Sequence, residues 1–292
     1  MRNSFSDNSS MLAIKCGDTW NHAHADAASF IYYSDGEEII SEGGTCAYGE
    51  KEYVDYFCSS FAHNTILYEN HGQERRDIFN HTRLKGKLFG EYSDENVKYI
   101  CADATGPMAH YYRRFLRHFL MVDDMVMIYD DLEAYESGKI QFLLHEKKSG
   151  YFKMLTECEK SIRKGFKNYN INETEDYFSY EQSTDAEGKA KFVSMIGKKS
   201  CDYAISDSDD MYKVFGGDWT FYINKLSDGS VMHKNCINKA EDYETDAILL
   251  AIGKNGIFFV NASFVRCNGK VLFDSKIRKT GFINKKKITA EV

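Results

Sequence analysis

Short apolar or alternating segments, separated by turn residues, run through almost the whole chain. SFIYY at 29–33, EEII at 37–40 and NTILY at 64–68 are each followed by Gly, Asn or Asp. Tyr and Phe supply twenty residues each, and both suit the pleated, half-buried surface of a strand. Strands spaced about ten to fifteen residues apart, with such turns between them, favour a large antiparallel β-sandwich of the all-β class.

Further segments extend this pattern to the C-terminus. They cover 115–122, 125–129, 139–146, 190–196, 219–223, 247–252, 256–265, 270–274 and 280–284. Asp123-Asp124 lies between two of them and predicts a tight hairpin. Amphipathic periodicity occurs only weakly, over 155–165, and predicts one short helix there. With one proline and no low-complexity stretch, no linker is evident, and we expect a single domain over 1–292.

The charge distribution excludes some partners. The net charge is −7, and no stripe of Lys and Arg alternates with aromatic residues, so nucleic acid is a poor partner. An acidic chain can still bind an anion, because local arginines and a metal can set the field inside a cleft. No apolar run approaches the roughly eighteen residues of a membrane-spanning helix. The polar start MRNSFSDNSS does not resemble a signal peptide.

The eight cysteines are scattered, and no CxxC pair occurs. This spacing argues against a zinc ribbon and against a small disulfide-rich scaffold. We expect reduced, partly buried thiols. The cysteine pattern does not fix the cellular compartment of the protein, although unpaired thiols favour the cytoplasm.

Three of the nine histidines cluster near the N-terminus, in WNHAHAD at 20–26 and FAHNT at 61–65. His22 and His24 are two residues apart, so on a strand both side chains leave the same face. Glu42 ends EEII before a glycine pair, and His63 precedes NTILY. Two imidazoles and one carboxylate with an open position form a recurrent first-row metal site, most often for zinc.

Other readings of these residues stay open. A single histidine on a strand is usually packed or solvated rather than a ligand. The spacing HxH…E…H also fits a cupin-like jelly roll that holds iron, manganese or zinc. From the residues alone, the prediction is a metal site on a β scaffold.

The run from Lys15 to Thr65 resembles the opening of the C-terminal β domain of heparinase II/III-like polysaccharide lyases. Gly17 followed by HAHADAASF, then IISEGGTCAYGE, then YFCSSFAHNTI follow that family's pattern. NHGQ at 70–73 and DATGPMAHYYRRFLRHFLMVDDMVMIYDDL at 103–132 resemble its next landmarks. The resemblance covers roughly 12–145 well and the remainder only in strand character.

The resemblance implies a lyase that cleaves uronic-acid polysaccharides, such as heparan-type chains or alginate. It implies zinc ligands at His24, Glu42 and His63, with Glu42 replacing the family's usual aspartate. His22 matches a position that faces the cleft and assists catalysis, and Tyr48 or Tyr53 matches a tyrosine that reaches the cleft. The metal looks structural, because it would pin the loop that carries these groups.

Remaining residues have smaller predicted roles. Asp26 is expected to orient an imidazole. Asn64 is expected to support the loop by hydrogen bonding, with substrate contact as the alternative. Arg75 is a candidate for binding an acidic sugar. His145 matches a recurrent strand histidine of the family without an assignable role, and Gln73 is expected in a turn or at the rim of the site.

Family lyases carry an α/α toroid before the β domain, with the cleft between the two. MRNSF matches the place where the β domain begins, so we expect this chain to lack the toroid and to be nearly inactive alone. Its partners would be an anionic polysaccharide and a toroid domain. Two alternatives remain: a free-standing cupin-like metal enzyme, and a non-catalytic carbohydrate-binding sandwich. The sequence does not name the glycan.

Overall fold

The computed structural model describes residues 1–17, 23–75, 84–198, 202–227, 236–284 and, for the backbone alone, 288–291. The chain divides into two compact units. Unit 1 comprises Met1–Phe89 and Ile100–Lys198, and unit 2 comprises Gly90–Tyr99 and Lys199–Val292. The described residues are nearly all β with antiparallel sheets, which confirms the predicted fold class. The expectation of a single domain over 1–292 stays a prediction.

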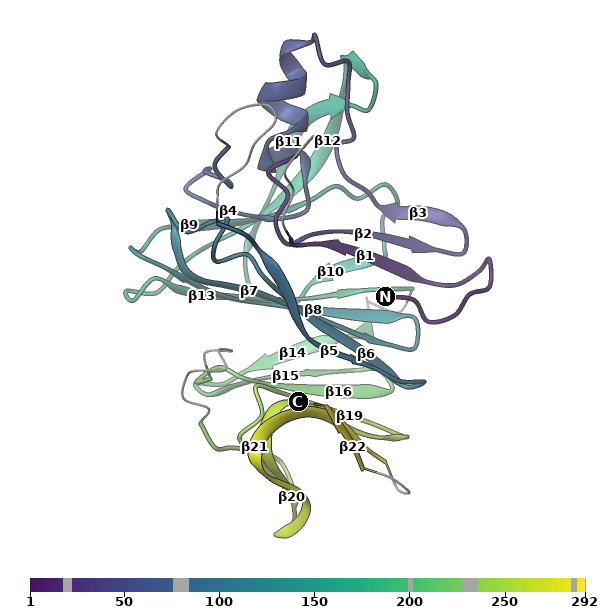
Figure 1. Cartoon of the computed structure of the whole chain (residues 1–292), viewed down its shortest axis with the longest axis vertical. Coiled ribbons are helices and arrows are strands. Elements are labelled where there is room, and N and C mark those ends of the chain that lie inside the picture. The colour runs from purple at the N-terminus through teal and green to yellow at the C-terminus, as the bar shows by residue number, and fades with distance from the viewer. Residues whose placement is uncertain (18–22, 76–83, 199–201, 228–235, 285–287, 292) are drawn as a thin grey trace. The chain divides into compact units, whose positions relative to one another are not determined.

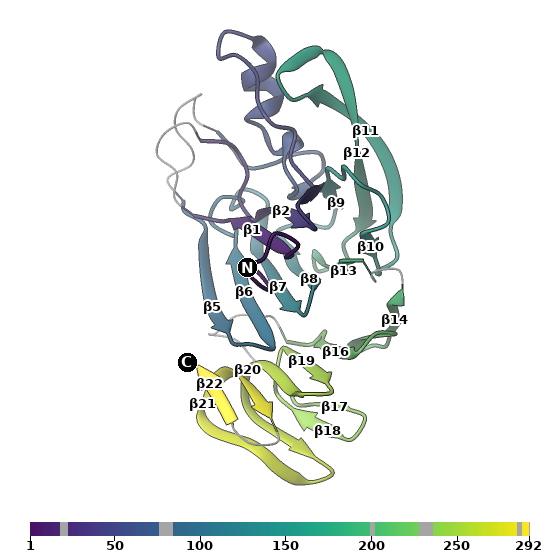
Figure 2. The same ribbon diagram turned by 90° about the vertical axis from the view of Figure 1, so that its right-hand side faces the viewer.

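Three sheets start in unit 1 (Figures 1 and 2). The first has the order β1 (Met11–Lys15), β2 (Ser29–Ser34), β3 (Glu37–Ile40). The second has the order β11 (Glu159–Lys167), β12 (Asn170–Ser183), β9 (Lys139–Leu144), β4 (Ile66–Tyr68). The third has the order β10 (Phe152–Met154), β13 (Lys189–Ile196), β8 (Met125–Ala134), β7 (Tyr112–Val122), β6 (Val97–Asp103), β5 (Lys87–Ser93).

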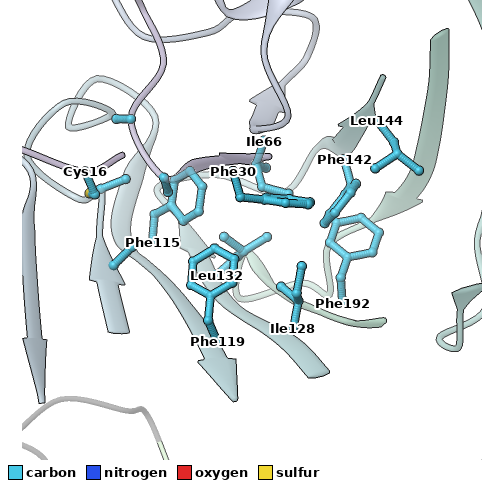
Figure 3. Packing of buried hydrophobic residues seen from close by; sticks show 14 of the residues in the cluster. Cys16, Phe30, Ile66, Phe115, Phe119, Ile128, Leu132, Phe142, Leu144 and Phe192 are labelled. Atoms are coloured by element: carbon cyan, nitrogen blue, oxygen red, sulfur yellow. The ribbon is translucent and has the colours of Figure 1, made fainter. Parts of the chain in front are cut away.

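The core of unit 1 lies between these sheets. Aromatic and aliphatic side chains from the three- and four-stranded sheets face those of the six-stranded sheet. Figure 3 shows Phe30 and Phe142 from the first side meeting Phe119 and Phe192 from the other, all fully or almost fully buried. An isolated bridge between Ile40 and Glu146 joins the two smaller sheets, which together form one face of the sandwich.

The C-terminal part of unit 2 forms a fourth antiparallel sheet. Its described strands run in the order β14 (Ala204–Asp207), β15 (Met211–Phe215), β16 (Trp219–Asn224), β19 (Leu249–Gly253), β20 (Gly256–Cys267), β18 (Tyr243–Thr245), β17 (Asn238–Ala240). β21 (Lys270–Asn284) pairs with β20 and with β22 (Ile288–Glu291). Register shifts in the β20–β21 pair divide this long ribbon into segments. A small apolar core packs within the sheet.

Most sequence-predicted strands are confirmed, but the predicted helix over 155–165 is wrong. Residues 159–167 form β11, which pairs antiparallel with β12. On one face Lys160 lies opposite Tyr180 and over the ring of Phe178, 3.6 Å from its centroid. Cross-strand packing of this kind outweighs a weak helical periodicity. The segments 270–274 and 280–284 were also expected as separate strands and belong to the single strand β21.

Helical structure is confined to short turns between β3 and β4. η1 (Tyr53–Phe57) is a single π-helical turn, and η2 (Ser60–Ala62) is a 3-10 turn. In both views the η1 turn lies beside the β11–β12 hairpin (Figures 1 and 2). No helix in the described part of the chain is long and apolar enough to span a membrane. None of the seven cysteines that the structure describes forms a disulfide.

Candidate functional site

The predicted ligands His24, Glu42 and His63 lie together, although 39 residues separate the two histidines. His63 occupies the centre. Its Nε2 lies 3.2 Å from Nδ1 of His24, and its Nδ1 lies 3.0 Å from Oε2 of Glu42. His63 is buried, whereas the Glu42 side chain is one quarter exposed. The predicted catalytic residue His22 lies outside the described residues.

The electrostatics of this row follow from burial and neighbouring charge. Burial favours neutral His63, but the charges of Glu42 and Asp26 outweigh it and raise the pKa of His63. Burial of Glu42 is likewise outweighed by His63, and the pKa of Glu42 is lowered. Burial, followed by the nearby His63, lowers the pKa of His24 to about 4. At neutral pH Glu42 is therefore an ionised carboxylate and His24 is neutral, and the neighbouring carboxylates shift His63 toward its charged form.

The loop that carries His24 is fastened to the loop that carries His63. The Ala25 N–H donates to the carbonyl of Cys58 over 2.8 Å, and the Ser60 hydroxyl donates to the carbonyl of Ala25 over 2.7 Å. The Thr65 hydroxyl donates to the carbonyl of Ala27 over 2.7 Å. The small and hydroxylated residues of HAHADAAS and SSFAHNT thus join the two backbones directly, which fixes the spacing of the two imidazoles.

The position of Glu42 depends on close backbone packing. The N–H groups on either side of it donate to the carbonyls of His145 and Ala62, from Ser41 over 2.9 Å and from Gly43 over 2.7 Å. A side chain at Gly43 would place Cβ 2.9 Å from Cβ of Ala62. Glycine is therefore required at 43 for the carboxylate to reach His63.

Asn64 acts as an internal support. It is fully buried, and its side-chain amide donates to the carbonyls of Phe30, over 2.7 Å, and Ser41. Its Oδ1 accepts from the N–H of His145 over 2.7 Å. These bonds connect β2, the Glu42 loop and the end of β9. Backbone groups engage both the donor and the acceptor of the Asn64 amide, which fits the predicted supporting role.

A buried ion pair beneath the site was not predicted from the sequence. Arg117 on β7 and Asp130 on β8 are both fully buried, and Nε and Nη2 of the arginine meet the two carboxylate oxygens at 2.5 and 3.3 Å. The remaining Nη1 donates to the carbonyls of Ala28 and Asn64, each over 2.8 Å. Arg117 thus holds the loop that follows His24 and the loop that follows His63 by hydrogen bonds to their backbones. Its signal in the sequence is an arginine inside FLRHFLMV, which is apolar apart from Arg117 and His118, matched by an aspartate in the next strand.

The two candidate tyrosines differ in exposure. Tyr53 on η1 is buried, and its ring centroid lies 6.2 Å from that of His24 in an edge-on contact. Burial and a hydrogen bond to Cys58 raise the pKa of Tyr53 further above its ordinary value near 10. Tyr48 is 66% exposed, with its ring centroid 4.7 Å from that of Tyr53. A raised pKa keeps the Tyr53 hydroxyl protonated and opposes its use as a base.

The other predicted residues surround this row. Asp26 binds Lys15 over 2.5 Å. Gln73 accepts from the N–H of Ala27 over 3.1 Å, so it contacts the His24 loop. His145 is buried and stacks on Tyr177 with ring centroids 4.5 Å apart, and burial lowers its pKa to about 3. A neutral, packed His145 is a structural residue beside Asn64.

The distances between His24, His63 and Glu42 indicate which of these side chains could hold one metal ion. Two nitrogen ligands about 2.0–2.1 Å from one tetrahedral ion stand roughly 3.3 Å apart, and His24 and His63 nitrogens are 3.2 Å apart. Glu42 instead lies at the opposite nitrogen of His63, and no three His, Cys, Asp or Glu residues in the described ranges form a metal-binding group. The spacing of the two imidazole nitrogens matches that of two ligands of one ion, and Glu42 lies where a carboxylate would orient His63. Glu42 as a direct metal ligand stays a prediction.

Comparisons with known structures match this fold. The chain superposes on the crystal structure of heparinase III with a TM-score of 0.58 and 14% identity, over 76% of this chain and 40% of that one. It superposes on a heparan sulfate lyase from Pedobacter heparinus with a TM-score of 0.56 and 13% identity, over 97% of this chain and 40% of that one. At these identities the likeness establishes the fold. The chain spans about 40% of the length of these structures.

A search of curated proteins by sequence finds no match. A family model described as "Heparinase II/III-like, C-terminal" matches residues 1–191. This match includes His24, Glu42, His63 and the Arg117–Asp130 pair beneath them, and it ends close to the boundary of unit 1 at Lys198. The chain belongs to the heparinase II/III-like family and corresponds to its C-terminal region.

Proposed function

We propose that this chain is the β-domain of a lyase that cleaves uronic-acid polysaccharides by β-elimination, working with an α/α toroid domain. The observation that carries the proposal is the row Glu42–His63–His24, held in the part of the chain that matches the family. The solved neighbours include a heparinase III and a heparan sulfate lyase, which indicates the substrate class.

β-Elimination requires three acts. A base removes the proton on the carbon next to the uronate carboxylate, the carboxylate is neutralised, and an acid protonates the departing glycosidic oxygen. A double bond then replaces the proton and the broken carbon–oxygen bond. We assign proton transfer to His22 and to an exposed tyrosine, Tyr48 rather than the buried Tyr53, because a polysaccharide must reach the group.

The row of three residues positions these groups. His24 lies two residues after His22, and its ring faces that of His63 with Nδ1 and Nε2 3.2 Å apart. Glu42 faces Nδ1 of His63 and orients its ring. One divalent ion, zinc by the preference for imidazole ligands, is proposed to be held by His24 and His63, with Glu42 supporting His63. When bound, the ion would cross-link the two loops and neutralise charge beside the cleft.

The lyase assay tests this proposal. The chain is joined to a toroid domain from a heparinase III and incubated with heparan sulfate, chondroitin, hyaluronan or alginate, and the absorbance of unsaturated uronate is followed. We expect cleavage of one class and a loss of at least about 100-fold for His22→Ala, in line with the usual contribution of general acid–base catalysis. The chain alone should be nearly inactive. Cleavage by His22→Ala at the wild-type rate would contradict the assignment.

Metal content is measured separately. The purified chain should contain zinc near one ion per molecule, and His24→Ala and His63→Ala should each lose it. Glu42→Gln keeps the reach of the side chain but not its charge, and it should weaken zinc binding roughly tenfold or more if Glu42 acts through His63. Iron or manganese in place of zinc would favour the cupin-like alternative.

A further inference from the structure

Two arginines of unit 1 show what the side edge of a guanidinium binds in this protein. Arg114 presents Nε and Nη2 to the two oxygens of Asp131 at 2.9 and 3.2 Å. Arg117 presents the same pair of atoms to Asp130 at 2.5 and 3.3 Å. In both cases two parallel N–H donors meet one carboxylate, the bidentate geometry in which charge-assisted hydrogen bonds are strongest.

Arg75 has the same edge without a partner. Its Nη1 donates to the carbonyl of Val54 over 2.9 Å, which fixes the guanidinium plane. Its Nε and Nη2 are both shielded from solvent and have no hydrogen-bond partner. Leaving two charged donors unsatisfied is costly, because each has given up its water. Among the described arginines, Arg75 alone has unpartnered shielded nitrogens.

The free edge belongs to the candidate site. Gln73, two residues before Arg75, accepts from the N–H of Ala27 over 3.1 Å, and its own N–H donates to the Ser60 hydroxyl over 3.0 Å. These bonds fasten the segment to the loops that carry His24 and His63. The positive charge of Arg75 helps to lower the pKa of His24 and opposes the burial that raises the pKa of Cys58. A ligand at this edge would therefore lie near the row of histidines.

We infer that the Nε and Nη2 atoms of Arg75 form a fork that binds the carboxylate of a uronic acid in the polysaccharide. The inference rests on the proposed function and names the residue that recognises the acidic group. A planar carboxylate matches two parallel donors, and an ammonium group does not offer this geometry. A sulfate ester shares the anionic character, so the experiment distinguishes it from a carboxylate.

Arg113 provides the matched control. Its side chain is 55% exposed, its guanidinium lies over the ring of Tyr135 at 5.4 Å, and Glu133 lies 3.8 Å away. It carries the same charge as Arg75 in the same unit. Because Arg113 already has partners, replacing it changes the net charge without removing an unsatisfied fork.

The test is a binding titration of the full chain followed by NMR of the arginine Nε–H groups and by calorimetry. The probes are a non-sulfated glucuronate-containing tetrasaccharide, the same sugar with its carboxylates reduced to alcohols, and an O-sulfated form of the reduced sugar. We expect the Arg75 Nε–H resonance to shift with the first probe and not with the reduced sugar. Arg75→Lys and Arg75→Ala should each weaken binding of the first probe at least about tenfold, and Arg113→Lys should not.

Several results would overturn the inference. One is equal binding of the carboxylate and the reduced sugar, and another is unchanged affinity in Arg75→Lys. Binding of the sulfated reduced sugar with the larger resonance shift would assign the fork to sulfate. A shifted Nε–H resonance in the toroid-linked protein before sugar is added would show that a carboxylate of the protein fills it. None of these depends on cleavage, so failure of the lyase assay with intact carboxylate binding would contradict the proposed function alone.

Discussion

The two units are built from the same antiparallel strands but bury different side chains. In unit 1 a fully buried arginine and aspartate, a buried asparagine and two buried histidines lie under and between the loops of the candidate site. In unit 2 the described core is a cluster of aliphatic and aromatic side chains, with polar burial concentrated at Asp246 and a few other small polar residues. The family model covers nearly all of unit 1 and the Gly90–Tyr99 segment of unit 2, and it leaves Lys199–Val292 unmatched.

This contrast teaches where precision is required. An apolar core tolerates rearrangement provided its volume is kept. A buried network of charges and amides is stable only in one arrangement, because each unsatisfied group is expensive. We infer that unit 1 uses such a network to fix the positions of His24 and His63, whereas unit 2 is a scaffold without this demand.

The largest expected effect comes from breaking the ion pair beneath the site. Arg117→Met leaves Asp130 as an uncompensated buried charge, and we expect a loss of about 3–5 kcal/mol in the free energy of unfolding of unit 1. The double variant Arg117→Met/Asp130→Leu replaces the pair with apolar side chains and should recover most of this loss. Denaturant unfolding measures both. A single variant that costs less than about 1 kcal/mol would remove the distinction between the units.

Acid should destabilise unit 1 more than unit 2. Burial lowers the pKa of His118 to about 4 and that of His145 to about 3, against about 6.5 for the unfolded chain. Above pH 6.5 both states are neutral and no effect arises. As the pH falls below 6.5 the unfolded chain binds the proton first, so each histidine removes about 1.4 kcal/mol per pH unit until its folded pKa is reached.

Hydrogen exchange at pH 7 and at pH 5 measures the acid sensitivity of each unit separately. Of the nine histidines only His233 falls in unit 2 by sequence, and it lies outside the described residues. His118→Gln removes one titrating group. Below pH 6.5 it should reduce the pH dependence of the free energy of unfolding of unit 1 by about 1.4 kcal/mol for each pH unit. Equal acid sensitivity of the two units would contradict the prediction.

A smaller effect is expected for the principal buried carboxylate of unit 2. Asp246 accepts from the N–H of Ser263 over 2.7 Å and the N–H of Phe264 over 3.2 Å, and Oδ2 accepts from the Ser263 hydroxyl over 2.7 Å. Asp246→Ala leaves these donors unsatisfied, and we expect a loss of about 1–3 kcal/mol in the stability of unit 2. Thermal unfolding measures this loss. The zinc content and sugar binding that we propose for unit 1 should not change in this variant. Loss of either function would tie the units together.

The smallest effect serves as the baseline. Lys167 and Glu173 form an exposed ion pair at the tip of the β11–β12 hairpin, over 2.6 Å. Exposed pairs contribute little because solvent and salt screen them. Lys167→Ala should leave the unfolding midpoint within experimental error. A measurable loss would show that the surface of unit 1 contributes to the network below.

Strand character was readable from the sequence because it depends on local pattern. SFIYY, EEII and the two segments around Asp123-Asp124 alternate or remain apolar over the length of one strand, and each is a strand in the structure. Asp123 adopts φ 53° in the turn, a conformation that aspartate tolerates. The helix prediction over 155–165 was wrong because the periodicity there is weak and the segment pairs with β12, which follows it in the chain.

The candidate site was readable only in part. HAHAD, the acidic residue before a glycine pair and AHNT identified His24, Glu42 and His63 as residues that lie together. The sequence did not reveal that Glu42 meets the nitrogen of His63 opposite to His24. It also missed Arg117, since an arginine within a strand is ordinarily an exposed residue and its partner Asp130 is identified only by strand pairing.

The sequence by itself determined the all-β class, the family and the residue types of the site, because these follow from periodicity and from short motifs. The tertiary structure alone decided which nitrogen faces which oxygen, which amide is buried and which described arginine has two shielded nitrogens without an acceptor. These properties depend on contacts between residues tens of positions apart, whose geometry is set by strand register and packing. A pattern along the chain does not contain that information.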